Sequence, residues 1–267
     1  MERYLAVLAA SAVMVAAVCP ALAAKSDFDG IWSPSDRGIG APQGGEAPGG
    51  APPGAGGERA GPQGGPPGRP PGAPGGRFQR MIPPYKPDWA ARYQALLVSS
   101  RDGKVLVDPT ARCLPPGMPR TMSTPFPIEF SVEPNRVLML FEIGGVRRIP
   151  TNGAKHPPAD NLNPTFMGDT VGHWEGDTLV ADTVGLRGDT VFDASGAMHS
   201  DKMHIVERIR LIGPDKLEDH MTIDDLDAFT KPWEVTHSYD RKSDWQIMEF
   251  VCEENNRGVD PNAPGDK

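Results

Sequence analysis

The chain is 267 residues long and carries a formal net charge of −8, because 35 Asp and Glu residues outnumber 27 Lys and Arg residues. Nucleic acids and anionic membranes attract concentrated Lys and Arg, so this charge disfavours both as partners. After the first 23 residues no apolar run is long enough to cross a bilayer, which argues against a later transmembrane segment.

Residues 1–23 have the pattern of a secretory signal peptide. Arg3 is the basic start, Leu5 to Val18 is the apolar core, and Ala21-Leu22-Ala23 places small residues where a signal peptidase reads. Cys19 offers the alternative of a lipid anchor, which the bulky Val18 before it disfavours. The sequence therefore predicts cleavage before Ala24 and a periplasmic or secreted protein.

Two cysteines remain after cleavage, Cys113 and Cys252. An even pair in an exported chain indicates a disulfide. The alternatives are two free thiols or a redox pair, and the absence of a CxxC spacing argues against the latter. We expect a structural disulfide that closes a long loop.

Residues 24–37 form the predicted first-strand region, because Gly30-Ile31-Trp32 matches the Gly-x-Trp that opens the first strand of lipocalin-like barrels. A single aromatic residue that pins a terminal strand to the core is an equal alternative. Residues 38–78 are dominated by Gly and Pro with almost no large apolar residue. Such a composition buries too little surface to offset chain entropy, so we expect a disordered insertion.

Residues 79–257 form the predicted β-rich domain. One helix is expected from Pro87 to about Ser99, with Trp89 and Tyr93 on its apolar face. The proline-rich 112–122 loop follows. Alternating segments then predict strands over 128–132, 137–143, 146–149, 166–175, 178–183, 203–211, 217–224, 232–239 and 245–252.

Short turns such as Gly144-Gly145 join these segments, and this even spacing is typical of an antiparallel sheet. We therefore predict a mostly β protein, an antiparallel lipocalin/calycin-like barrel with one N-terminal helix. An open antiparallel sheet and a β-sandwich are the alternatives. Residues 258–267 are expected to be a disordered tail.

Six motifs appear in order along the chain: CLPPGMPR, VRRIP, GHWEGDTLVADT, HSDKMHIVER, TKPW and CEENN. Together they resemble a family of uncharacterised exported bacterial proteins, and the likeness runs from Pro84 to Arg257. The resemblance implies a secreted, lipocalin-like β domain and brings no activity with it. The Gly/Pro-rich insertion is a departure from the family pattern.

Several ionisable residues fall in the apolar rows of these strands. Glu207 shares a row with Ile205 and Ile209, and His237 with Val235. A buried carboxylate needs a partner or a raised pKa, so an Arg–Glu–His–Asp cluster in the barrel is the predicted site; structural ion pairs are the alternative. The catalytic candidates are Glu207, His237 and Asp182, and the ligand-binding candidates are Arg147, Arg148, Trp174, Trp233 and Tyr239.

No metal or cofactor is predicted. The densest possible ligand group, His199, Asp201 and His204, lacks HxH or HExxH spacing, and there is neither a GxSxG motif nor a phosphate-binding glycine loop. The leading hypothesis is an exported barrel that binds a small, partly apolar molecule. The alternatives are a cofactor-free lyase, hydratase or isomerase that uses an inward Glu or His base, and an envelope interaction scaffold that uses the Pro/Gly segment.

Overall fold

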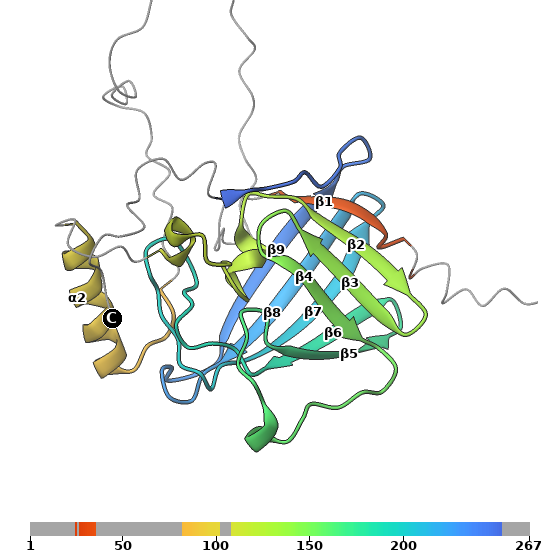
Figure 1. Ribbon diagram of the computed structural model, residues 1–267. Coiled ribbons are helices and arrows are strands. Elements are labelled where there is room, and N and C mark those ends of the chain that lie inside the picture. The colour runs from red at the N-terminus through yellow and green to blue at the C-terminus, as the bar shows by residue number, and fades with distance from the viewer. Residues whose placement is uncertain (1–24, 26, 36–81, 102–107, 253–267) are drawn as a thin grey trace, which may run out of the picture.

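The computed structural model describes residues 25, 27–35, 82–101 and 108–252 (Figure 1). The predicted signal peptide (1–23), the Gly/Pro-rich insertion (38–78) and the tail (258–267) lie outside the described residues. None of the helices in the described part is both long and apolar enough to cross a membrane.

The described residues form one nine-stranded sheet with the order β4-β3-β2-β1-β9-β8-β7-β6-β5, and every hydrogen-bonded pair in it is antiparallel. Tight turns join four of the eight neighbouring pairs, and Gly176 adopts the positive φ of 64° that the turn between β5 and β6 needs. The strands are β1 (Gly30–Pro34), β2 (Ile128–Glu133), β3 (Arg136–Phe141), β4 (Gly145–Pro150), β5 (Asp169–Glu175), β6 (Thr178–Val184), β7 (His204–Gly213), β8 (Lys216–Asp224) and β9 (Trp233–Arg241).

The sheet curls into a nearly closed barrel whose seam lies between β4 and β5 (Figure 1). An odd number of alternating strands leaves these two edge strands parallel to each other. Side chains close the seam: Arg147 of β4 bonds Thr170 of β5, and Ile149 packs against Gly172. A Cβ atom at Gly172 would lie 2.6 Å from Ile149 Cγ2, so the close approach requires glycine. The predicted barrel is confirmed, and the open sheet and the sandwich are wrong.

The inward rows of the strands pack together and fill the barrel interior. Trp32 is fully buried, donates its indole N–H to the carbonyl of Phe28 at 2.9 Å, and has the Arg241 guanidinium stacked on its ring. This confirms the predicted place of the Gly-x-Trp in the first strand. The remaining interior is mostly aliphatic and aromatic, with Ile128, Phe130, Val137, Met139, Ile149, Leu179, Ile205, Ile209, Leu217, Met221 and Ile223 among its members.

One end of the barrel, where β5, β7 and β9 begin, is covered by loops and helices, and we call it the capped end. The 3-10 helix η2 (Arg120–Ser123) lies there, and its Met122 is buried, as is Met118 just before it. The predicted helix is confirmed as α2 (Pro87–Arg101), beside the same end (Figure 1). It is anchored by the Lys86 amide on the carbonyl of Ala228 at 2.8 Å and by Tyr93 Oη, 2.6 Å from Ser195 Oγ.

The predicted disulfide joins Cys113 to Cys252, whose Cα atoms are 5.5 Å apart. Such a bond is typical of a chain that folds in an oxidising compartment. The predicted strand over 245–252 is wrong. β9 already pairs with β8 and β1, which leaves no free edge beside it, and the segment is instead held by the disulfide and by Phe250 against Phe126.

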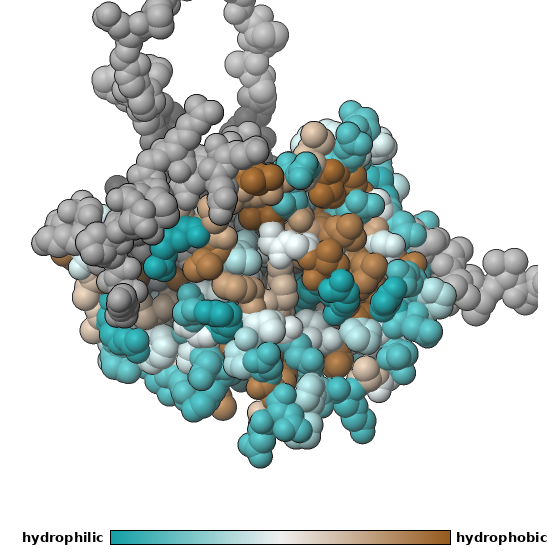
Figure 2. Space-filling model, in the orientation of Figure 1, coloured by the Kyte–Doolittle hydropathy of each residue, from teal (hydrophilic) through white to brown (hydrophobic). Residues whose placement is uncertain are grey.

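The outer surface is mixed in character. Figure 2 shows that the face seen in Figure 1 is largely hydrophilic, and that its hydrophobic side chains gather over β2 to β4. Val146 of β4 belongs to this outer wall and is exposed.

Candidate functional site

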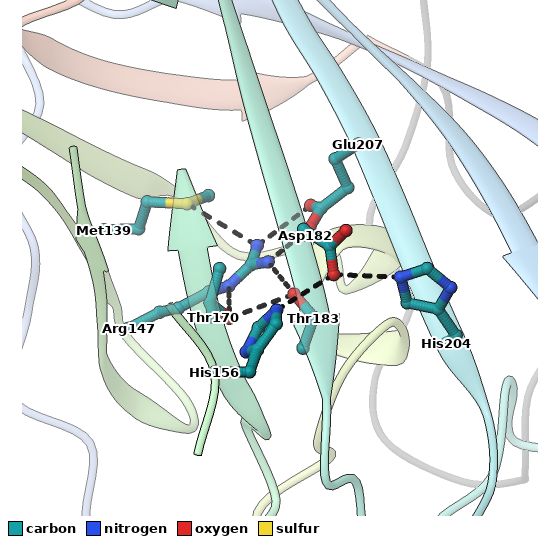
Figure 3. A network of polar contacts seen from close by, with 8 residues as sticks. All are labelled: Met139, Arg147, His156, Thr170, Asp182, Thr183, His204 and Glu207. Carbon is teal, nitrogen blue, oxygen red and sulfur yellow. Dashed lines mark hydrogen bonds and ion pairs between the residues drawn. The ribbon is translucent and has the colours of Figure 1, made fainter. Parts of the chain in front are cut away.

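A buried ion pair crosses the barrel interior near the seam (Figure 3). Arg147 Nη1 of β4 donates to Glu207 Oε1 of β7 at 2.9 Å, and Nη2 makes a second bond to Oε2. The guanidinium also donates to Thr183 Oγ1 at 2.8 Å and faces Thr170 Oγ1 at 3.4 Å. Both charged groups are almost completely buried. The pair therefore satisfies itself and holds three strands to β4.

Asp219 of β8, in contrast, is a buried carboxyl group without hydrogen bonds among the described residues. It is fully buried, and neither of its carboxylate oxygens has a hydrogen-bond partner among the described residues. Burial first, and then the nearby negative charge of Glu207, raise the pKa of Asp219 well above its ordinary value. Both effects favour the protonated, neutral form of this side chain inside the barrel.

His237 and Tyr239 of β9 complete the interior polar group. His237 lies directly across from Asp219 in the β8–β9 ladder, and burial lowers its pKa to about 4. Tyr239 donates its hydroxyl to the carbonyl of Met122 at 2.6 Å, and burial raises its pKa well above 10. Both side chains are therefore uncharged at neutral pH, so Arg147 and Glu207 carry the interior charges of this group.

We expect the Asp219→Asn variant to be more stable than the wild type at neutral pH. The folded protein keeps a proton on Asp219 that the unfolded chain releases above about pH 4. Each further pH unit lowers the wild-type free energy of unfolding by about 1.4 kcal/mol, until the pH reaches the raised pKa. The amide does not titrate. Urea unfolding should therefore show a gap between variant and wild type that widens from pH 4.5 to pH 6.5.

The Asp224→Asn variant is the control for that measurement. Asp224 belongs to the outward row of the same strand, so its replacement removes a carboxylate without touching the interior. A gap for Asp219→Asn that stays constant with pH would contradict the neutral state of Asp219.

The predicted site residues divide between the two faces of the wall. Glu207, His237, Arg147 and Tyr239 are all buried in the interior. Arg148 is exposed and points outward, because β4 alternates and Arg147 takes the inward place. Asp182 is also outward, since Leu179, Ala181 and Thr183 form the inward row of β6. Asp182 is therefore not part of the predicted interior Arg–Glu–His–Asp cluster, and of the two candidate arginines only Arg147 faces inward.

The predicted aromatic ligand contacts serve as packing. Trp174 is half-buried and meets the Phe28 ring edge-on, with ring centroids 5.2 Å apart. Trp233 is buried at the capped end, where it packs edge-on against Phe192 and Phe229. Neither ring contributes to the open cleft that Trp89 and Arg92 of α2 line at the capped end.

Asp182 belongs instead to a chain of polar residues on the outer wall, formed by Asp169, His156, Asp182 and His204, which we call the outer His–Asp chain. His156 Nδ1 lies 2.6 Å from Asp169 Oδ1, and its Nε2 lies 3.0 Å from Asp182 Oδ1. His204 Nε2 lies 2.9 Å from the same Asp182 oxygen (Figure 3). Within the described residues, no group of three or more His, Cys, Asp or Glu has the geometry to hold a metal ion.

An open cleft of about 640 Å³ lies at the capped end, outside the barrel interior. One wall is α2, which contributes Trp89 and Arg92, with the guanidinium 4.5 Å from the indole centroid. The other residues come from the loops around the ends of β5, β6 and β7, and they are Pro164, Arg187, Gly188, Asp189, Met198, His199, Ser200 and Asp201.

His199 lies at the buried side of this cleft. Its Nδ1–H donates to the carbonyl of Ser200 at 2.8 Å, and Nε2 lies 2.7 Å from Thr190 Oγ1. Burial lowers the pKa of His199, which favours the neutral ring. Ser200 is held in turn by two bonds of 2.7 Å to the buried carboxylate of Asp225. Hydrogen bonds therefore hold both His199 and Ser200 on this side of the cleft.

Three groups of residues were missed from the sequence. Asp219 had a readable signal, because it falls in the row of Leu217, Met221 and Ile223. The contact between His156 and Asp182 had no readable signal in the sequence, because a loop and two strands bring the two residues together. The cleft had no readable signal in the sequence either, since its residues come from four separate segments.

Comparison with known protein families and with characterised proteins finds no match, so these sites are interpreted from their geometry.

Proposed function

We propose that this is an exported protein, periplasmic or secreted, that binds a small, partly apolar molecule in the cleft at the capped end. The observation that carries the proposal is the cleft itself. Its volume of about 640 Å³ falls within the range of roughly 300–1,000 Å³ typical of small-molecule sites. The disulfide supports export, and the six motifs support kinship with the exported family described above.

The lining of the cleft suits a molecule with an apolar body and a polar group. Trp89, Met198 and Pro164 offer apolar contact. Arg187 is already paired with Asp189, whereas the described residues give Arg92 its stacking contact on Trp89 and no carboxylate partner. The Arg92 guanidinium is thus held in place with its N–H groups available to an acceptor on the ligand.

The interior group supports the enzyme alternative less well. Both carboxylate oxygens of Glu207 accept bonds from Arg147, and a pKa of about 4 makes His237 a weak base near neutral pH. Binding in the cleft needs no rearrangement of this packed interior.

Titration with 1-anilinonaphthalene-8-sulfonate, which has aromatic rings and one anionic group, tests the proposal. We expect saturable binding with one site per chain. Trp89→Ala and Arg92→Ala should each weaken it at least 10-fold, because they remove the apolar and the cationic contact respectively.

The Gln94→Ala variant is the matched control, since Gln94 is exposed on the same helix and does not line the cleft. Its affinity for the dye should equal that of the wild type. Dye binding that is equal in all four proteins would show that the cleft is not the site.

A further inference from the structure

The outer His–Asp chain has a proton arrangement that its contacts determine. A carboxylate oxygen accepts hydrogen bonds, so each ring nitrogen that faces one must carry a proton. Both nitrogens of His156 face carboxylates, which makes its contacts complete when the ring is doubly protonated. Nε2 of His204 faces Asp182 and is therefore the protonated nitrogen of that ring.

This arrangement leaves a lone pair on Nδ1 of His204. Among the described residues, that nitrogen has no hydrogen-bond partner, and in Figure 3 it points away from Asp182. The His204 side chain is 41% exposed, so the ring is open to solvent. A histidine that has one ring nitrogen held by a carboxylate, here Nε2, and the other nitrogen open, here Nδ1, has the geometry of a general base.

The surroundings limit what this base could act on. Asp182 pairs in the sheet with Val171 on one side and Val206 on the other, which gives an apolar strip beside the base. Asp169 and Asp182 flank His156, and Asp224 lies directly across from His204 in the ladder. Negative charge on three sides repels anionic substrates such as phosphate esters, whereas a neutral acyl compound is not repelled.

We propose that His204, oriented by Asp182, is a general base that hydrolyses small neutral acyl esters on the outer wall of β6 and β7. This site is separate from the cleft and does not depend on the cleft ligand. Nδ1 takes a proton from a water molecule as the water oxygen bonds to the acyl carbon. The ester C–O bond then breaks, and the proton passes from His204 to the departing alkoxide, which gives one acid and one alcohol. Asp182 acts as the positioning residue that holds the tautomer.

The first test follows hydrolysis of p-nitrophenyl acetate by the full chain. We expect His204→Gln to lower kcat/KM at least 10-fold, since a positioned base contributes roughly 10²–10⁴-fold. The matched control is His220→Gln. His220 is similarly exposed, at 43%, but its two nitrogens are occupied by Glu234 and Thr236, each at 2.9 Å. This control should retain the wild-type rate.

The second test needs no variant of His204. Diethyl pyrocarbonate acylates free imidazole nitrogens, so mass spectrometry should find His204 modified at least 10-fold faster than His220. Nitrogen-15 NMR should show the Nε2–H tautomer of His204 in the wild type, and Asp182→Asn should reduce that preference together with kcat/KM. Equal modification of the two histidines, or the opposite tautomer, would overturn the assignment. Fast modification without ester turnover would overturn the hydrolytic role.

Discussion

Replacing Arg147 with methionine should lower the free energy of unfolding by about 3–5 kcal/mol, because it leaves Glu207 as a buried charge without a partner. Glu207 is fully buried, and the guanidinium engages both of its carboxylate oxygens. The seam should also lose hydrogen bonds, since Arg147 joins β4 to Thr170 of β5 and Thr183 of β6. Urea unfolding with the disulfide intact measures the change.

Two further variants separate the buried charge from the loss of packing. In the Arg147→Met background, Glu207→Leu removes the orphaned charge and should restore most of the lost stability, as replacement of buried ion pairs by apolar residues often does. Arg148→Met is the matched control, because Arg148 is the exposed neighbour on the same strand, and its cost should stay below about 0.5 kcal/mol. Equal costs for the two arginine variants would contradict a stabilising buried pair.

Loss of the Cys113–Cys252 disulfide should have an effect of similar size. The two residues are separated by 139 positions, and the chain-entropy relation gives about 5 kcal/mol for closing a loop of that length, as an upper value. The double replacement Cys113→Ala and Cys252→Ala should therefore unfold at a markedly lower urea concentration than the wild type. The first structural effect should be release of the 245–252 segment from the barrel, because this segment lacks sheet pairing.

Reduction of the wild type provides the control for the disulfide. Dithiothreitol should shift the wild-type transition to that of the double variant and leave the variant unchanged. Cys113→Ala alone should match the double variant, because either replacement removes the bond. A difference below about 1 kcal/mol in the free energy of unfolding between oxidised and reduced protein would contradict this prediction, because it would show that the cross-link hardly restricts the unfolded chain.

Strand positions and several inward residues were predictable because alternation with a period of two is a local property. Glu207 and His237 each fall in a row of apolar residues, and burial of those rows followed. Alternation did not correctly predict which face of the sheet Asp182 occupies. Both rows of β6 contain apolar residues, and outward Val180 is itself buried, at 6% exposure, on the face that His156 of the 151–165 loop reaches. Alternation identifies two faces but does not label the inner one when both are covered.

The sequence by itself determined the antiparallel barrel, its helix, the disulfide and the interior places of Glu207 and His237. The tertiary structure alone decided how the seam closes, which arginine of the Arg147-Arg148 pair turns inward, and where the cleft and the outer His–Asp chain lie. The physical reason is range. Turn residues and side-chain alternation act over a few positions, whereas His156 and His204 meet at Asp182 because the curled sheet and a crossing loop bring distant segments together.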